Sequence, residues 1–381
     1  MRKFYCILTL WCIATTVNGQ SFRNEWIDYN KTYFKFPVAE TRLYRIPQAI
    51  LASAGLGTVP AQDFQLWRNG EEVPLYITQT SGPLAADGYI EFFGKMNDGY
   101  PDTELFASPA DQVDLDRSYF SDTAWFYLTV NAGKPNLRLL AANNNVVGTN
   151  LPVEAFFIHN QKFHSDYQWN HGAASVVAGQ AVRGSLLNGG EGWASPSFNN
   201  YYVQNFNVAI PQLQTSLPGN TIEFSYSMSG NYHKDRKAYV LLNDSLVARP
   251  FLSGYQMIWD TVKGISSSVI RNNALAFTMA SDNGDFWDNC ILNMAVVKYP
   301  RKFTFENDFI FQFELPANMA GNHLRMKGFR SNGNNVVLYD LKNLKRYQSI
   351  QQSDSSLFLL QPSATTRQLV IAAQGNEIRL V

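Results

Sequence analysis

The sequence predicts an all-β fold, and three observations support this prediction. Short segments that alternate apolar and polar residues recur along the chain, and turn-forming pairs such as Asn69-Gly70 separate them. Aromatic residues make up 14% of the chain and charged residues 16%, a balance that suits half-buried sheet surfaces. The sequence pattern contains no long amphipathic helix, heptad or internal repeat.

The chain is longer than one hydrophobic core usually supports. At 381 residues, two or three domains of ordinary size are expected. The predicted parts are a signal peptide over residues 1–19, a β-rich domain over residues 20–145, a jelly-roll β-sandwich over residues 146–300 and an Ig-like β-sandwich over residues 301–381.

The first residues have the pattern of an export signal. Arg2 and Lys3 precede an apolar run over residues 4–14, and cleavage is expected after Gly19. This run is too short for a preferred membrane span, and no later stretch has the apolar length of a transmembrane helix. We therefore expect an exported protein with no transmembrane segment, located in the periplasm, on the outer-membrane surface or in the medium.

The first domain reads as a series of strands. Residues 31–46 alternate around a Pro-Val-Ala-Glu-Thr turn and predict a hairpin, and residues 47–54 predict a short helix that ends at Gly55. Asn69-Gly70 predicts a tight hairpin turn. Alternating strands are also expected over residues 88–94 and 123–130.

A boundary is predicted where the composition becomes that of a linker, over residues 140–151. After it, the strand and turn spacing suits a jelly-roll sandwich, with strands expected over residues 201–210, 221–230, 237–247, 273–281 and 290–300. A third set of short strands suits an Ig-like sandwich and is expected over residues 303–316, 323–329, 335–341, 356–362 and 367–374.

The charge balance excludes one class of partner. Lys plus Arg equals Asp plus Glu at 31 each, so the chain has no net field that would gather polyanions. Nucleic acid is therefore not expected as a partner.

Several motifs resemble the N-terminal, non-catalytic region of gingipain-like cysteine peptidases, the family that includes the sortase of the type IX secretion system. They are EWIDYNKTYFKFPVAETRLYRI, LWRNGEEVPLYI, GYIEFFGKMNDGYPDTELF, SYFSDTAWFYLTV, NCILNMAVVKYPRKFTF and VVLYDL, in this order. The resemblance spans nearly the whole mature chain. It implies that the first domain is propeptide-like and that a caspase-like peptidase domain would follow Val381, where the family's catalytic His and Cys lie.

This resemblance implies a scaffold that positions the peptidase and docks secretion-system proteins or secreted cargo through sheet edges and loops. The complete protein would then cleave a cargo's C-terminal signal through a thioester and transfer the cargo to an acceptor. No residue of this chain matches the family's catalytic pair. The alternative is a stand-alone surface adhesin or carbohydrate-binding sandwich.

Cys290 is the first candidate nucleophile, with His171 or His233 as its base. Because Cys6 and Cys12 leave with the signal peptide, Cys290 is the only cysteine expected in the mature chain, which then forms no internal disulfide. It opens the apolar segment CILNMAVV, where a free cysteine is most simply a small core residue. The sequence therefore assigns no catalytic residue.

The loop SDNGDFWDN is a candidate structural calcium site. Asp282, Asn283, Asp285 and Asp288 offer hard oxygen ligands around Gly284. The spacing does not match an EF-hand, and Asp-Asn-Gly clusters also form plain turns. Calcium is the one cofactor that the sequence suggests.

His159, His164 and His171 lie close together in the chain with Asp166. If the segment were a strand, His164 would point away from the other two, which is poor geometry for one metal ion. We expect ordinary polar loop histidines.

Six aromatic residues of the jelly-roll segment either form a sugar-binding or peptide-binding surface or fill the core. They are Trp169, Trp193, Tyr201, Tyr202, Trp259 and Trp287. A row of exposed, roughly coplanar rings would favour glycan binding.

Overall fold

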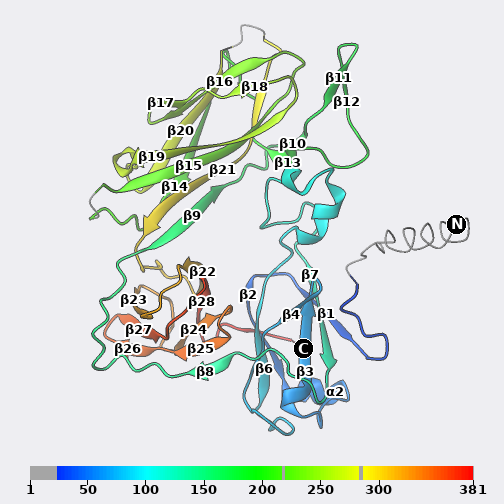
Figure 1. Cartoon of the computed structure of the whole chain (residues 1–381), viewed down its shortest axis with the longest axis vertical. Helices are drawn as coiled ribbons and strands as arrows, with labels where there is room; N and C mark the ends of the chain where they lie inside the picture. Colours follow the sequence, from blue (N-terminus) through cyan, green and yellow to red (C-terminus); the bar gives the residue numbers. More distant parts are fainter. Residues whose placement is uncertain (1–23, 217–218, 283–285, 381) are drawn as a thin grey trace, which may run out of the picture.

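The structure is a computed structural model that describes residues 24–216, 219–282 and 286–380. It is nearly all β, which confirms the predicted fold class. Three β-sandwiches follow one another along the chain, and Figure 1 shows the first and third side by side with the second beyond them. The predicted signal peptide lies outside the described residues. No helix of the described residues has the length and apolarity needed to cross a membrane.

The first sandwich consists of two four-stranded sheets around one core. One sheet has the order β1 (Phe34–Val38), β7 (Ala124–Val130), β3 (Phe64–Arg68) and β4 (Glu71–Val73). The other has the order β29 (Ile378–Arg379), β2 (Arg42–Pro47), β6 (Tyr89–Gly94) and β5 (Tyr76–Ile77). The rings of Phe92 and Phe126 meet in the core between them, with centroids 5.5 Å apart and a tilt of 38°.

The predicted hairpin over residues 31–46 is wrong in its pairing, although both strands form. β1 pairs with β7 and β2 pairs with β6, so the turn carries the chain from one sheet to the other. Both strands bury one face in the shared core, with Val38 and Tyr44 inside it. The alternation of apolar and polar residues therefore shows only that each strand has a buried face. A hairpin and a corner between two sheets share this feature, so the pattern does not distinguish them.

The local turn signals are confirmed. Asn69 and Gly70 have φ angles of 50° and 81° between β3 and β4, and Asn243 and Asp244 have 42° and 66° between β16 (Arg236–Leu242) and β17 (Ser245–Ala248). Residues with φ above zero at both central positions match the twist of a two-residue hairpin. The predicted helix forms as α2, and the helical elements within the described residues are α2 (Gln48–Ser53), η1 (Ala61–Asp63), η2 (Tyr100–Leu105), η3 (Pro109–Asp111) and η4 (Ser267–Val269).

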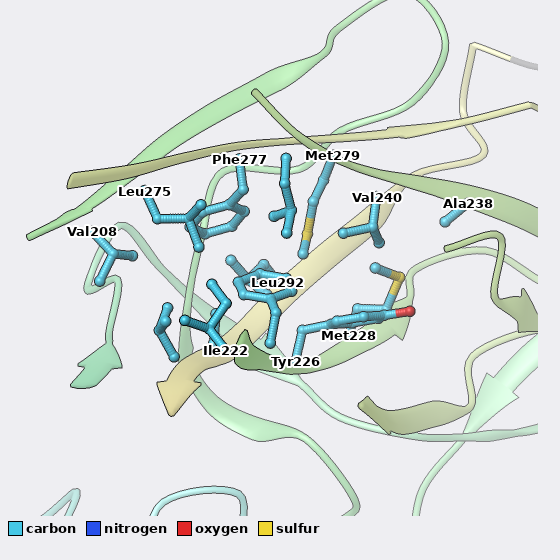
Figure 2. Close-up of a cluster of buried hydrophobic side chains, with 14 of the residues drawn as sticks. Val208, Ile222, Tyr226, Met228, Ala238, Val240, Leu275, Phe277, Met279 and Leu292 are labelled. Atoms are coloured by element: carbon cyan, nitrogen blue, oxygen red, sulfur yellow. The ribbon is translucent and has the colours of Figure 1, made fainter. Parts of the chain in front are cut away.

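The second sandwich has the largest core. One sheet has the order β14 (Gln204–Ala209), β20 (Ala274–Ser281), β16 (Arg236–Leu242) and β17 (Ser245–Ala248), with β18 (Phe251–Leu252) also paired to β16. The facing sheet has the order β19 (Met257–Ser266), β15 (Thr221–Gly230), β21 (Cys290–Arg301) and β9 (Phe157–Phe163). Figure 2 shows side chains of both sheets interdigitating, among them Phe277, Val240 and Tyr226.

Two small antiparallel pairs extend from this sandwich. They are β10 (Gln168–His171) with β13 (Glu191–Ala194), and β11 (Ser175–Val177) with β12 (Gln180–Val182).

The third sandwich packs a five-stranded sheet on a three-stranded sheet. The larger sheet has the order β22 (Ile310–Leu315), β28 (Arg367–Ala373), β24 (Val336–Asp340), β25 (Lys345–Gln348) and β8 (Leu140–Ala142). The smaller has the order β23 (Asn322–Lys327), β27 (Ser355–Leu360) and β26 (Ile350–Gln352). The core between them contains Phe313, Leu338 and Phe358.

The first and third sandwiches exchange strands. β29, near the end of the chain, pairs in parallel with β2 of the first sandwich, and β8 pairs in parallel with β25 of the third. Part of the segment expected to be a linker is thus a sheet strand. Asn144 fixes it further, because its side chain accepts a hydrogen bond from the Leu359 amide and donates to the Leu357 carbonyl. The predicted domain boundaries stay predictions.

A mixed apolar and ionic interface joins these two sandwiches. Leu43 of β2 and Leu139 pack against Val337 of β24 and Val370 of β28. Glu91 of β6 is completely buried beside them. Its carboxylate bonds Arg45 at 2.8 Å, accepts a hydrogen bond from the Tyr339 hydroxyl and lies 3.6 Å from Arg346.

Further contacts hold this carboxylate in place. Arg346 also donates to the Tyr339 hydroxyl at 3.1 Å, and Arg45 pairs with Glu377 at 2.7 Å. Burial, with the neighbouring Glu91 carboxylate, raises the pKa of the Tyr339 hydroxyl well above its usual value, so Tyr339 stays a donor. The ionic network thus spans the first sandwich, the third sandwich and the residues before β29.

We predict that Glu91→Gln lowers the free energy of unfolding by about 3–5 kcal/mol, because removing one partner leaves buried cations without their counter-charge. Urea unfolding measured by tryptophan fluorescence tests this. The matched control, Glu71→Gln, changes an exposed glutamate and should stay within about 0.5 kcal/mol of the parent. Equal effects of the two substitutions would contradict the role given to Glu91.

Candidate functional site

Cys290 is a core residue. It begins β21, has no exposed surface and belongs to the main core of the second sandwich. Its backbone exchanges hydrogen bonds of 2.8 Å with Phe198. Burial raises the pKa of the thiol to about 12, although the Arg236 guanidinium opposes this effect. A protonated, inaccessible thiol cannot act as a nucleophile, which agrees with the core interpretation from sequence.

The candidate calcium loop is only partly described. Asp288 is buried in an ion pair with Arg236, which is equally buried, and the Asp282 carboxylate accepts a 3.0 Å hydrogen bond from the Lys237 amide. Asn283 and Asp285 lie outside the described residues. Within residues 24–216, 219–282 and 286–380, no three His, Cys, Asp or Glu side chains are grouped to hold a metal. The calcium site stays a prediction.

Phe286 and Trp287 of this loop form an exposed aromatic cluster with Tyr201 and Tyr202. The four side chains are between 48% and 68% exposed. The ring of Phe286 contacts Tyr201 at 6.1 Å, Tyr202 at 5.7 Å and Trp287 at 5.3 Å. The rings are inclined at 49°, 72° and 85°, so the cluster is a faceted knob and not a coplanar row.

Asn199 holds the two loops of the aromatic cluster together. It is completely buried, and its amide donates to the Phe286 carbonyl at 3.0 Å and to the Asn289 side chain at 2.9 Å. Its side-chain oxygen accepts the backbone amides of Tyr201 and Tyr202, both at 2.8 Å. One buried amide thus fixes the position of four exposed rings.

The other predicted aromatics lie elsewhere. Trp169 and Trp193 meet edge to face at 5.8 Å across the β10–β13 pair, and Trp259 is exposed on β19. Sequence reasoning brought Tyr201, Tyr202 and Trp287 into one set but missed Phe286. Its position beside Trp287 in the Phe-Trp pair was the available signal.

The three clustered histidines do not form one site. His159 lies within β9 and packs on Tyr299 and Phe311, with ring centroids 5.7 and 5.5 Å away. His164 follows β9 and contacts Asp114 at 3.2 Å, while His171 ends β10. The expectation of loop histidines is therefore wrong for His159 and His171, because both belong to strands.

His164 belongs to a junction charge cluster that ties the first sandwich's outer segment to β9. Asp114 is nearly buried and contacts Lys162 at 3.3 Å, His164 at 3.2 Å and Arg117 at 3.5 Å. Arg117 also bonds Asp166 at 2.6 Å. Burial lowers the pKa of His164, and the Asp114 carboxylate opposes that change.

A groove of about 810 Å³ lies where the three sandwiches meet. Three edge strands each contribute three consecutive residues to its lining, namely Glu71, Glu72 and Val73 of β4, Ile158, His159 and Asn160 of β9, and Gln312, Phe313 and Glu314 of β22. Side chains alternate between the faces of a strand, so consecutive lining residues place the backbone edge itself on the groove. No local sequence signal marks the groove, because each wall comes from a different sandwich.

One wall of the groove is fixed by its own contacts. The Glu72 carboxylate accepts hydrogen bonds from the Leu137 amide at 2.6 Å and the Gln65 side chain at 2.8 Å. Arg68 donates to the Met96 carbonyl at 2.9 Å and pairs with Asp98 at 3.0 Å. Arg68 is therefore paired with a carboxylate, and Glu72 is hydrogen-bonded to two neutral donors.

Comparison with known proteins gives a structural likeness and no sequence match. No family model matches the chain, and no curated protein matches it. The structure is similar to dimeric latent PorU from Porphyromonas gingivalis, with a TM-score of 0.53 and 9% identity over 91% of this chain. This chain covers 32% of that PorU chain, about a third of its length. The likeness shows a PorU-like fold.

Two further solved structures are more distant. A CBM36 carbohydrate-binding module in complex with calcium and xylotriose matches 36% of this chain and 98% of its own, with 10% identity and a TM-score of 0.23. PNGF-II matches 82% of this chain and 80% of its own, with 9% identity and a TM-score of 0.24. At these TM-scores neither likeness bears on fold or function.

We predict that His159 makes the protein less stable in acid. Burial, together with nearby Arg301, lowers its pKa to about 4, whereas an unfolded histidine titrates near 6.5. As the pH falls from about 6.5 to about 4, His159 binds a proton in the unfolded chain but not in the folded chain, so stability is lost across this window.

The test compares urea unfolding of the parent and His159→Phe at pH 7 and pH 4.5. The phenylalanine keeps a ring against Tyr299 and Phe311 but does not titrate, so the variant should lose less stability on acidification. Equal losses in the two proteins would contradict the prediction.

Proposed function

We propose that this chain is the non-catalytic region of an exported gingipain-like cysteine peptidase that resembles the type IX secretion sortase. Its role is to hold the peptidase in position and to dock secreted cargo or secretion partners. The observation that carries the proposal is the PorU-like fold, which extends over 91% of the chain. The motif resemblance along the sequence supports the same assignment.

The packing of the three sandwiches suits a positioning role. The first and third sandwiches share strands and a buried ionic network, and the junction charge cluster ties the second to the first. Relative domain motion is the default when interfaces are small and polar, but this interface buries apolar side chains and a carboxylate. A unit held in this way can present a neighbouring domain in one orientation.

The reaction of the complete protein is part of the proposal. A peptidase domain encoded beyond Val381 would supply the catalytic His and Cys, cleave the cargo's C-terminal signal through a thioester and pass the cargo to an acceptor. The chain's own Cys290 takes no part, because it is buried and protonated.

The first experiment determines the DNA sequence beyond codon 381 and then deletes the whole gene in its host. We expect an open frame that encodes a caspase-like α/β domain, and we expect secreted proteins to accumulate with uncleaved C-terminal signals, detected by mass spectrometry. A stop codon directly after Val381, or normal processing in the deletion strain, would overturn the peptidase assignment.

A second candidate function is glycan binding, favoured by the exposed aromatic cluster. Aromatic rings with large exposed faces are suited to apolar contact with sugar rings. The inclination of the rings favours a short or branched glycan over an extended chain, because successive sugars could not lie on one plane.

We predict that Trp287→Ala lowers the affinity for a glycan that the chain binds by about tenfold, since one aromatic contact is worth about 1–1.5 kcal/mol. A glycan array followed by calorimetry provides the measurement. Trp259→Ala, which removes another exposed tryptophan, on β19, is the matched control and should bind as the parent does. Absence of any array signal, or equal losses in the two variants, would reject this candidate.

A further inference from the structure

The strand exchange between the first and third sandwiches is reciprocal. β8 follows the first sandwich in the sequence but pairs with β25 of the third, beside which Figure 1 shows it. β29 follows the third sandwich in the sequence but pairs with β2 of the first. Each of these two sandwiches is therefore completed by a strand from the other's part of the chain.

The segment that follows β8 is anchored at both ends and exposed between them. The Asn144 side chain donates to the Gln348 carbonyl at 2.7 Å, and the Leu151 carbonyl lies 3.1 Å from Nδ1 of His323. Between these anchors Val147 is 81% exposed, the highest value among the exposed large hydrophobic side chains of the described residues. The chain is thus accessible at one short loop between two fixed points.

Residues 145–150 have the features of a proteolytic cut site. Their sequence is Asn-Val-Val-Gly-Thr-Asn, and exposed loops of small and polar residues are the preferred places of nicking. An endopeptidase that accepts small apolar side chains would hydrolyse the bond after Val147. Water then gives its oxygen to the Val147 carbonyl carbon and both hydrogens to the Gly148 nitrogen, so a carboxylate and an ammonium group form.

A cut at this bond leaves the exchanged strands in place. The N-terminal piece contains the first sandwich and β8, and the C-terminal piece contains the second and third sandwiches and β29. The Leu380 amide donates to the Arg45 carbonyl at 3.0 Å, and the Leu140 amide donates to the Leu344 carbonyl at 3.0 Å. Each piece therefore still holds a strand that belongs to a sheet of the other.

Side chains around β29 also join the two pieces. Ile378 and Leu380 pack against the core of the first sandwich. Arg45 of the N-terminal piece pairs at 2.7 Å with Glu377 of the C-terminal piece, whose side chain is 2% exposed. The buried network of Glu91 crosses between the pieces in the same region.

The second sandwich adds contacts to the N-terminal piece. The Leu187 amide donates to the Leu105 carbonyl at 2.8 Å, and the Ala107 amide donates to the Leu187 carbonyl at 2.9 Å. Arg117 bonds Asp166 at 2.6 Å across the same junction. The N-terminal piece is thus bound to both of the other sandwiches by contacts that do not involve the cut bond.

We propose that residues 145–150 are a cleavage site for an endopeptidase that accepts valine, and that the cleaved chain stays one particle in which β29 retains the first sandwich. This goes beyond the proposed function. The first domain is propeptide-like by resemblance, yet a cut at its connection would not release it.

The experiment inserts the recognition sequence of a site-specific protease between Val147 and Gly148 of the full chain, because exposed loops tolerate insertions. After digestion, a denaturing gel should show two pieces. Size-exclusion chromatography at about 1 μM should show a single particle at the elution volume of the uncut protein. Separate elution of the two pieces would overturn the proposal.

The role of β29 is tested in the same cleavable chain. Ile378→Asp places a charge against the core of the first sandwich, and we expect the dissociation constant of the two pieces to rise about tenfold or more. The matched control is Arg379→Ala, which changes an exposed side chain of β29 and keeps its backbone pairing, so the constant should stay within about threefold. Analytical ultracentrifugation on dilution gives both constants. Equal constants would overturn the role given to β29.

A further measurement uses the unmodified protein, so it holds even if a variant does not fold. Elastase, whose small specificity pocket accepts residues such as valine, digests the native chain, and mass spectrometry identifies the pieces. We expect a cut within residues 145–150 and co-elution of the N-terminal piece with the remainder. The proposal is overturned if elastase leaves residues 145–150 intact, or if the piece that ends there elutes alone.

Discussion

The buried carboxylate of Glu91 is the contact on which the arrangement of the molecule depends. It lies on β6 of the first sandwich, and its partners are Arg45 on β2 and Tyr339 and Arg346 on β24 and β25 of the third. A buried charge is tolerated only when its partners are in place, so the two sandwiches have one packing in which this group is satisfied. Apolar contacts such as Leu43 with Val337 contribute adhesion, while the ionic network selects the orientation.

The groove follows from this orientation. The first and third sandwiches pack together at the apolar cluster, and residues of this cluster line the groove together with the edge strands β4 and β22. The second sandwich closes the opening with β9, which the junction charge cluster around Asp114 draws towards the first sandwich. A groove built in this way requires all three sandwiches.

The exposed aromatic cluster has a different physical basis. Its position depends on one sandwich alone, through Asn199 and the Arg236–Asp288 ion pair beneath the loops. Loops placed on a rigid sandwich can change their exposed residues without disturbing the core. The molecule thus combines a shared groove, constrained by packing between sandwiches, with a local surface that is free to vary.

Local features of the chain were predictable from sequence because their causes are local. Alternation placed strands such as β7 and β15, and Asn69-Gly70 marked a hairpin turn because both residues readily adopt positive φ. Cys290 was assigned to the core from its apolar neighbours.

Alternation of apolar and polar residues shows that a strand has a buried face, but not which strand lies beside it. β1 and β2 therefore enter different sheets, and β8 and β29 join sheets distant in sequence. Glu91 and Tyr339 are 248 residues apart, and Gln312 meets the groove only after three sandwiches have packed. Pairing, buried charge and the groove were decided by tertiary structure, since they arise from contacts between segments that no short stretch of sequence contains.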